Sequence, residues 1–129
     1  MIRKIAHFAL VVNDYDEAID FYVNKLKFTL VENTKLDEHK RRVLVSPDVD
    51  KSSSILLAKA DGEKQQNFVG NQSGGRVFLF LNTDNFEEDY RNLLENGVKI
   101  VRETKEEPYG KVLVFEDLYG NLWDLIEPK

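Results

Sequence analysis

The 129-residue sequence has no cysteine, only three prolines, and no long uninterrupted apolar run. Without cysteine, a disulfide framework, a thiolate nucleophile and a zinc–thiolate site are all excluded. A membrane-spanning helix needs about 20 consecutive apolar residues, and polar residues interrupt the opening segment too early for a signal peptide. We therefore expect a cytoplasmic protein with no membrane partner.

An excess of basic charge is also missing. The 18 Lys and Arg residues are scattered and outnumbered by 23 Asp and Glu residues, which gives a net charge of −5. This balance argues against a nucleic-acid partner. No phosphate-binding glycine loop and no Ser/His/Asp arrangement is present. With 42% hydrophobic and 11% aromatic residues, the length suits one globular domain over residues 1–129.

An internal duplication organises the chain. When residues 7–26 (HFALVVNDYDEAIDFYVNKL) are shifted by 71 positions, they align with residues 78–97 (FLFLNTDNFEEDYRNLLENG). Each segment reads as an apolar strand, a polar break and a helix with an apolar stripe. Asp14 with Glu17, and Asp84 with Glu87, are typical of helix N-terminal caps, and Gly97 is typical of a helix end.

Three strand-like runs follow each predicted helix. They are 28–32, 41–45 and 54–59 in the first half, and 98–102, 111–115 and 122–127 in the second. The polar, Gly-rich stretch 61–75 reads as a loop. The sequence therefore predicts an α+β fold of two β-α-β-β-β modules, module one over 1–60 and module two over 76–129, joined by the linker 61–75.

One helix covers only one face of a four-stranded sheet, so each module leaves a face open. Two modules placed edge to edge would curl these faces around a shared cleft. From strand alternation we expect His7 to face the cleft from the first strand, and Phe78, Phe80 and Asn82 from the first strand of module two. We expect Glu127 to face it from the last strand, on the same side as Trp123 and Leu125.

The duplicated modules, with a His in the first strand and a Glu ending the last, resemble the vicinal oxygen chelate superfamily of glyoxalases, bleomycin-resistance proteins and dioxygenases. GGRVFLFLNTDNFEEDY, EEPYG and VFEDLYGNLWDLIEP carry the resemblance. Catalytic members hold a divalent metal on four positions in the cleft. The resemblance implies His7 and Glu127 as two of these ligands, whereas Leu56 and Phe78 stand at the other two.

The resemblance implies two functions. One is a metal-dependent lyase, isomerase or dioxygenase, with Zn, Ni, Mn or Fe held weakly by His7 and Glu127 and with Glu127 as the candidate base. The alternative is a metal-free protein that sequesters a small molecule without turnover. A third hypothesis, which does not depend on the resemblance, is a scaffold or regulatory domain with no ligand turnover. The ligand-binding candidates are Phe78, Phe80, Asn82, Trp123 and Tyr109, a loop hydroxyl over the cleft. We also expect a homodimer, because open clefts and strand edges are usually covered.

Overall fold

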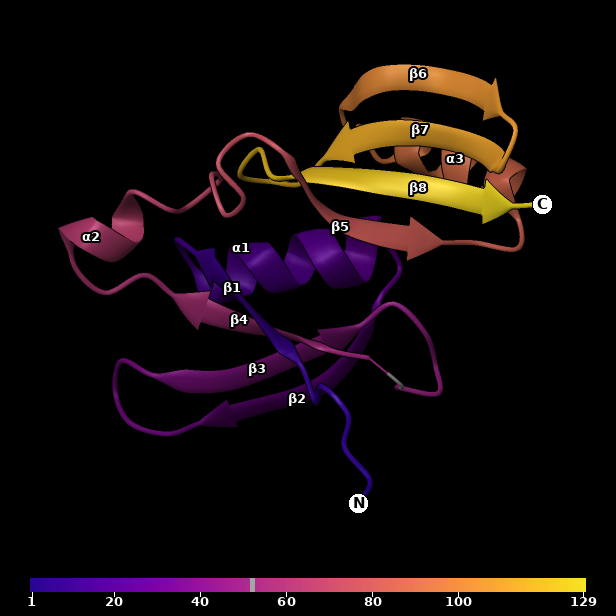
Figure 1. Cartoon of the computed structure of the whole chain (residues 1–129). Helices are drawn as coiled ribbons and strands as arrows, with labels where there is room; N and C mark the ends of the chain where they lie inside the picture. Colours follow the sequence, from indigo (N-terminus) through magenta and orange to yellow (C-terminus); the bar gives the residue numbers. More distant parts are fainter. Residues whose placement is uncertain (52) are drawn as a thin grey trace. The chain divides into compact units, whose positions relative to one another are not determined.

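A computed structural model describes residues 1–51 and 53–129. The chain divides into two compact units, Met1–Val69 and Gly70–Lys129, so their boundary falls inside the predicted linker. Each unit contains a four-stranded mixed sheet built in the order β-α-β-β-β (Figure 1). The predicted α+β fold of two repeated modules is therefore confirmed.

The first sheet has the strand order β1-β4-β3-β2. Strand β1 runs parallel to β4, whereas the other neighbours are antiparallel. The helical segment after β1 starts as an α-helix and continues as a π-helix, η1. The elements are β1 (Phe8–Val12), α1 (Tyr15–Ile19), η1 (Asp20–Lys25), β2 (Thr29–Lys35), β3 (Arg41–Ser46) and β4 (Ile55–Lys59).

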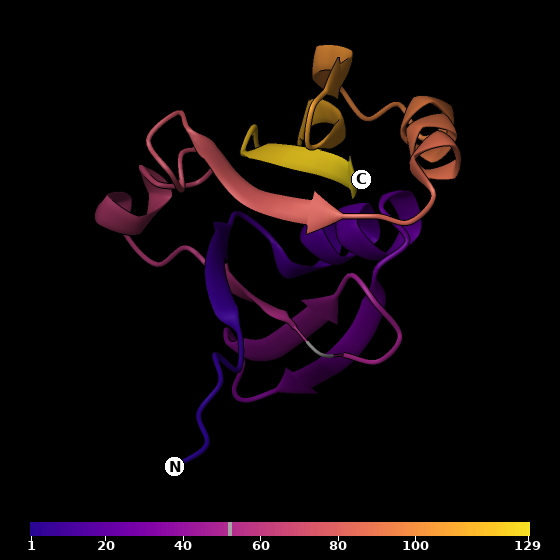
Figure 2. The same cartoon turned by 45° about the vertical axis from the view of Figure 1, so that its right-hand side comes forward.

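The second sheet repeats this topology with the order β5-β8-β7-β6, again with only the first pair parallel. Its elements are β5 (Val77–Asn82), α3 (Phe86–Glu95), β6 (Ile100–Glu107), β7 (Gly110–Glu116) and β8 (Leu122–Pro128). The predicted linker is not all loop. It contains a short helix, α2 (Glu63–Gln66), in the connection from β4 to β5 (Figure 2).

The helix starts follow the predicted cap chemistry with one shift of position. The Asp14 carboxylate accepts the N–H of Glu17 at 2.9 Å, as predicted for α1. The cap of α3 is Asn85, not Asp84: its side-chain oxygen accepts the N–H of Glu88 at 3.3 Å. An amide or a carboxylate oxygen can accept a free N–H of the first turn equally well. Residue type alone therefore could not predict which of Asp84 and Asn85 caps the helix.

Each helix buries one face of its own sheet. In the first unit, the fully buried side chains of the strands include Leu10, Val12, Val43, Val45 and Leu57. In the second unit, the side chains buried beneath the helix include Phe86, Leu93, Leu113, Phe115, Trp123 and Leu125, and Val114 is buried on the opposite face. Because successive strand residues point to opposite faces, these core positions also identify the residues on the face that the helix leaves uncovered.

Candidate functional site

The open face of the second sheet carries a row of four side chains across all four strands. The strand register pairs Phe80 of β5 with Asp124 of β8, Asp124 with Val114 of β7, and Val114 with Arg102 of β6. Directly paired residues point to the same face of a sheet. A carboxylate therefore lies in the middle of this face, between an aromatic and an aliphatic side chain.

One oxygen of the Asp124 carboxylate is unsatisfied among the described residues. Its Oδ1 atom is buried and has no hydrogen-bond partner among the described residues. Burial raises the pKa of the Asp124 carboxyl above its usual value, and the positive charge of Arg102 opposes this shift only in part. A buried acceptor without a donor costs about 1–3 kcal/mol. Asp124 is thus a group that a bound molecule with a donor would satisfy.

Glu127 does not lie on this open face, and the prediction that it faces the cleft is wrong. Its Oε1 accepts the backbone N–H of Phe86 at 2.9 Å. Phe86 is the first residue of α3, so Glu127 lies on the helix-covered face and satisfies one of the free N–H groups at the start of that helix. The carboxylate is occupied as a helix cap, which argues against its predicted roles as base and metal ligand.

Trp123 lies on the same helix-covered face. Its side chain is only 2% exposed, and its ring is stacked on Phe115 with centroids 5.9 Å apart. The prediction that Trp123 lines the cleft is therefore wrong. Phe115 is its direct neighbour in the β7–β8 register, so the two rings form a cross-strand core pair beneath α3.

Phe78, Phe80 and Asn82 alternate with Leu79 and Leu81 along β5. In the register, Leu79 and Leu81 stand beside the core residues of β8, whereas Phe80 stands beside Asp124 and Asn82 beside Ile126. Phe80 and Asn82 therefore share the open face, as expected from alternation. Phe78 lies where the β5–β8 register shifts, so its predicted place on this face stays a prediction. Phe80 is 66% exposed, which is unusual for so large an apolar ring and is typical of a contact surface.

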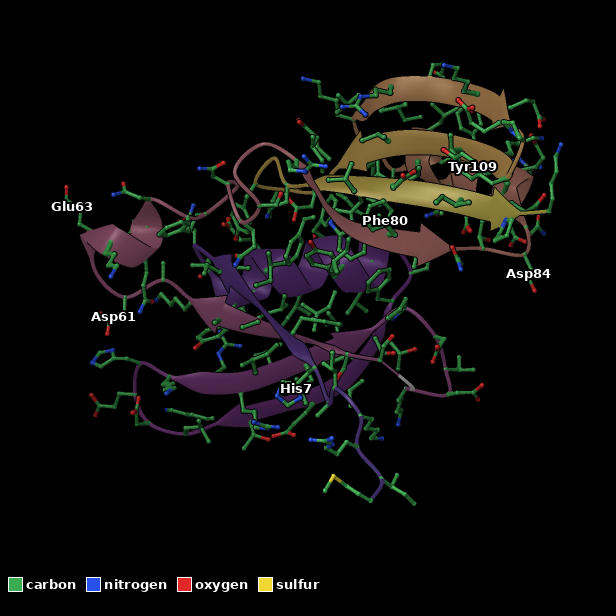
Figure 3. All side chains as sticks on the ribbon, in the orientation of Figure 1. His7, Asp61, Glu63, Phe80, Asp84 and Tyr109 are labelled. Atoms are coloured by element: carbon green, nitrogen blue, oxygen red, sulfur yellow. The ribbon has the colours of Figure 1, made fainter. Side chains whose placement is uncertain are left out.

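Tyr109 lies away from this row, in the two-residue turn between β6 and β7 (Figure 3). Its side chain is 58% exposed, and its carbonyl accepts the N–H of Lys129 at 3.1 Å. Gly110, the first residue of β7, is paired with Pro128 at the end of β8. Tyr109 thus stands at the edge of the second sheet, and its predicted contact with a ligand stays a prediction.

His7 belongs to the first unit. It is half-buried and lies directly before β1 rather than within a strand (Figure 3). By alternation it shares a face with Ala9 and Val11, and these are paired with Leu56 and Ala58 of β4. The open face of the first sheet is therefore aliphatic around the predicted ligand, and the metal role of His7 stays a prediction.

Sequence reasoning missed Asp124, although a signal was present. In β8, Trp123 and Leu125 are large core residues and Asp124 lies between them. Strict alternation of apolar and polar positions places a carboxylate on the opposite face. Within residues 1–51 and 53–129, no group of three or more His, Asp or Glu side chains is arranged to hold a metal ion.

None of the helices among the described residues is long and apolar enough to span a membrane.

Comparison with known proteins gives full-length relatives. An uncharacterized protein of Shewanella frigidimarina (strain NCIMB 400) is 59% identical over 128 residues, which cover 98% of this chain and 95% of the relative. The uncharacterized protein YurT of Bacillus subtilis (strain 168) is 28% identical, covering 96% of this chain and 98% of its own length.

Solved structures agree with the fold over the whole chain. The crystal structure of UcmS2 is 28% identical with a TM-score of 0.85, and covers 98% of this chain and 99% of its own. TnmS3, an antibiotic binding protein from a Streptomyces species, is 28% identical with a TM-score of 0.78, covering 99% and 98%. Residues 4–125 match the family model of the Glyoxalase/Bleomycin resistance protein/Dioxygenase superfamily, and the chain belongs to that superfamily.

Proposed function

We propose that this protein binds an aromatic or amphipathic small molecule with a protonated amine on the open face of the second sheet, and releases it chemically unchanged. The observation that carries the proposal is the Asp124 carboxylate, whose buried Oδ1 has no partner among the described residues. A ligand ammonium group would supply the missing donor. Hydrogen bonds that involve a charged group contribute about 1.5–3 kcal/mol.

The surroundings of Asp124 suit the apolar part of such a ligand. Phe80, its direct neighbour in the sheet, exposes most of its ring. A flat aromatic ligand stacked on that ring would remove apolar area from water and gain from ring–ring contact. The net charge of −5 favours approach of a cation over long range. TnmS3, which has the same fold, is described as an antibiotic binding protein.

The metal-dependent alternative has less support. A catalytic metal ion is ordinarily held by three protein ligands and one open position. Of the two residues predicted to hold it, Glu127 caps α3 on the helix-covered face. The superfamily name covers enzymes and resistance proteins alike, so the choice depends on the site chemistry, which here favours binding without turnover.

The test is calorimetric titration of daunorubicin, an aromatic molecule with an amine, into wild type and two variants. Asp124→Asn keeps the size of the side chain and removes its charge. It should weaken binding about tenfold or more, from the charged hydrogen bond. Asp84→Asn removes the same charge from an exposed loop position of the same unit and should leave affinity within about twofold.

Phe80→Ala should also weaken binding, because it removes the exposed ring. Mass spectrometry of the ligand after prolonged incubation should recover it unaltered. Equal affinity of wild type and Asp124→Asn would place the ligand elsewhere. Conversion of the ligand to a product, whether with or without added divalent metal, would support the enzyme alternative instead.

A further inference from the structure

A separate hollow opens within the first unit, where β3 and β4 part. Its volume is about 830 Å³, which is within the range of small-molecule sites. It lies between the β2–β3 hairpin, the two strands and the segment that leads to α2. Its lining includes Tyr15, Lys40, Arg41, Arg42, Ala58 and Lys59. We call this hollow the β3–β4 pocket.

The pocket exists because the two strands pair over a short stretch only. The register between β3 and β4 contains two pairs, Leu44 with Leu56 and Val45 with Ile55. At Arg41, outside these two pairs, the partner of the β3 backbone is not β4 but the buried Tyr15 of α1, whose hydroxyl accepts the N–H of Arg41 at 3.2 Å. The helix side chain thus satisfies the β3 backbone and holds the strands apart.

Basic side chains gather at this pocket, although the whole chain is acidic. Arg41 forms an ion pair with Asp16 at 2.9 Å, and Arg42 forms one with Glu32 at 3.3 Å. By contrast, Lys40 and Lys59 form no ion pair with any described residue. Two exposed ammonium groups at the rim are therefore outside any ion pair, although the charge of Lys40 helps to lower the pKa of the nearby Asp37 carboxyl.

Two carboxylates, those of Asp37 and Asp61, also line the pocket, and the hairpin turn engages that of Asp37. The Asp37 carboxylate accepts the backbone N–H groups of His39 and Lys40, each at 2.8 Å, and so shapes the hairpin turn. These two hydrogen bonds, His39 first, lower the pKa of Asp37 and keep it ionised as a turn acceptor. A second hollow of about 320 Å³ borders the same turn and shares Tyr15, Asp37, His39, Lys40, Arg41 and Lys59.

Apolar groups form the remaining wall of the pocket. Leu36, Leu56, Leu57, Ala58 and Ala60 line it, and Leu36 is 55% exposed. An anion bound here would leave an apolar surface beside it for the body of the same molecule. The combination fits an organic acid better than an inorganic anion, because only the former removes apolar area from water.

We propose that the β3–β4 pocket is a second ligand site, specific for an organic anion whose carboxylate, sulfonate or phosphate group binds Lys40 and Lys59 and whose apolar body rests on the Leu36 and Ala58 side. The β3–β4 pocket belongs to the first unit and would select an anion, whereas the site around Asp124 belongs to the second unit and would select a cation. The two sites can therefore be tested independently.

The experiment uses 8-anilinonaphthalene-1-sulfonate, an aromatic sulfonate whose fluorescence rises on binding. Wild type should bind it saturably, and rising salt should weaken binding because the ammonium groups are exposed. Lys40→Gln and Lys59→Gln should each weaken binding about threefold, since one exposed charge contributes modestly. The double variant should lose about tenfold by additivity. Lys99→Gln, an exposed lysine of the second unit, is the matched control with an unchanged constant.

Ala60→Trp tests the pocket by filling it. Ala60 follows β4, and its backbone N–H is bonded to the carbonyl of Val12 at 2.8 Å, which the substitution leaves in place. The tryptophan should abolish saturable binding, while near-UV circular dichroism confirms that all variants stay folded. Binding unaffected by the lysine variants would overturn the proposal, as would loss of the probe in Phe80→Ala alone, which would place the probe on the second sheet.

Discussion

Replacing Glu127 distinguishes a helix cap from a ligand-site residue. In the structure its Oε1 accepts the N–H of Phe86, the first residue of α3, at 2.9 Å. The cap residue Asn85 accepts a different N–H, that of Glu88. Glu127→Ala therefore leaves one backbone donor of the first turn without its partner, while Asn85 keeps its own bond.

The size of the effect follows from two contributions. Loss of a side-chain acceptor at a helix start costs about 1 kcal/mol. Loss of a negative charge beside the positive end of the helix dipole costs a further 0.3–1 kcal/mol or so. We expect Glu127→Ala to lower the free energy of unfolding by about 1.5 kcal/mol, from the sum of these terms. Glu127→Gln keeps an acceptor and should lose only about 0.5 kcal/mol.

Urea unfolding followed by far-UV circular dichroism measures these changes, with Asn85→Ala as a reference of about 1 kcal/mol. Daunorubicin affinity of folded Glu127→Ala should match that of wild type, because the side chain lies on the covered face. The reasoning would be refuted by unchanged stability together with a large loss of ligand or metal affinity, since Glu127 would then be a ligand-site residue.

Four further outcomes are expected. Asp124→Asn should raise the melting temperature at neutral pH. Burial raises the pKa of the Asp124 carboxyl, so above that pKa the ionised carboxylate destabilises the folded state. The difference between variant and wild type should vanish in acid, where the wild-type carboxyl is protonated. Gly70→Ala should lower stability by more than about 1 kcal/mol, because Gly70 has a φ of +75° and an added Cβ would overlap the Tyr119 carbonyl; urea unfolding measures this. Calorimetric titration of Zn, Ni, Mn and Fe(II) should find weak binding that His7→Ala changes little; tight binding by wild type would revive the metal site. Light scattering should find a homodimer of the 15.0 kDa chain, and a monomer at tens of micromolar would contradict this.

The fold could be predicted because its signals are local. Polar breaks mark where each helix starts, and alternation marks the strands, so the predicted runs differ from the observed strands mostly at their ends. The prediction for β6 was the least complete, ending at Arg102 instead of Glu107. Its register with β7 shifts twice, and such bulges break the alternation from which a strand is recognised. The helix α2 has no buried residue, so the sequence contains no apolar stripe from which this helix could be predicted.

The site could be predicted only in part, because the repeat does not hold to the end of the chain. A shift of 71 residues matches β1 with β5 but matches Leu56 with Glu127. In the structure, Ala9 is paired with Leu56 and Phe80 with Asp124. Three fewer residues separate the paired strands in the second unit. An odd offset reverses the face of every residue in a strand, which moved the expected carboxylate from Asp124 to Glu127.

When the two units are aligned by their strand pairing, Asp124 corresponds to Leu56. Its counterpart Leu56 shows that an aliphatic side chain suits this position in the same fold, and Leu56 pairs with Ala9 as Asp124 pairs with Phe80. A carboxylate there gains no hydrogen bond at Oδ1 and incurs a desolvation cost. Groups that destabilise the free protein are found where binding or catalysis requires them. The two sheets thus share one topology, in which the position of the aliphatic Leu56 in the first unit is occupied by the carboxylate of Asp124 in the second. We propose that this difference makes Asp124 a ligand-binding residue.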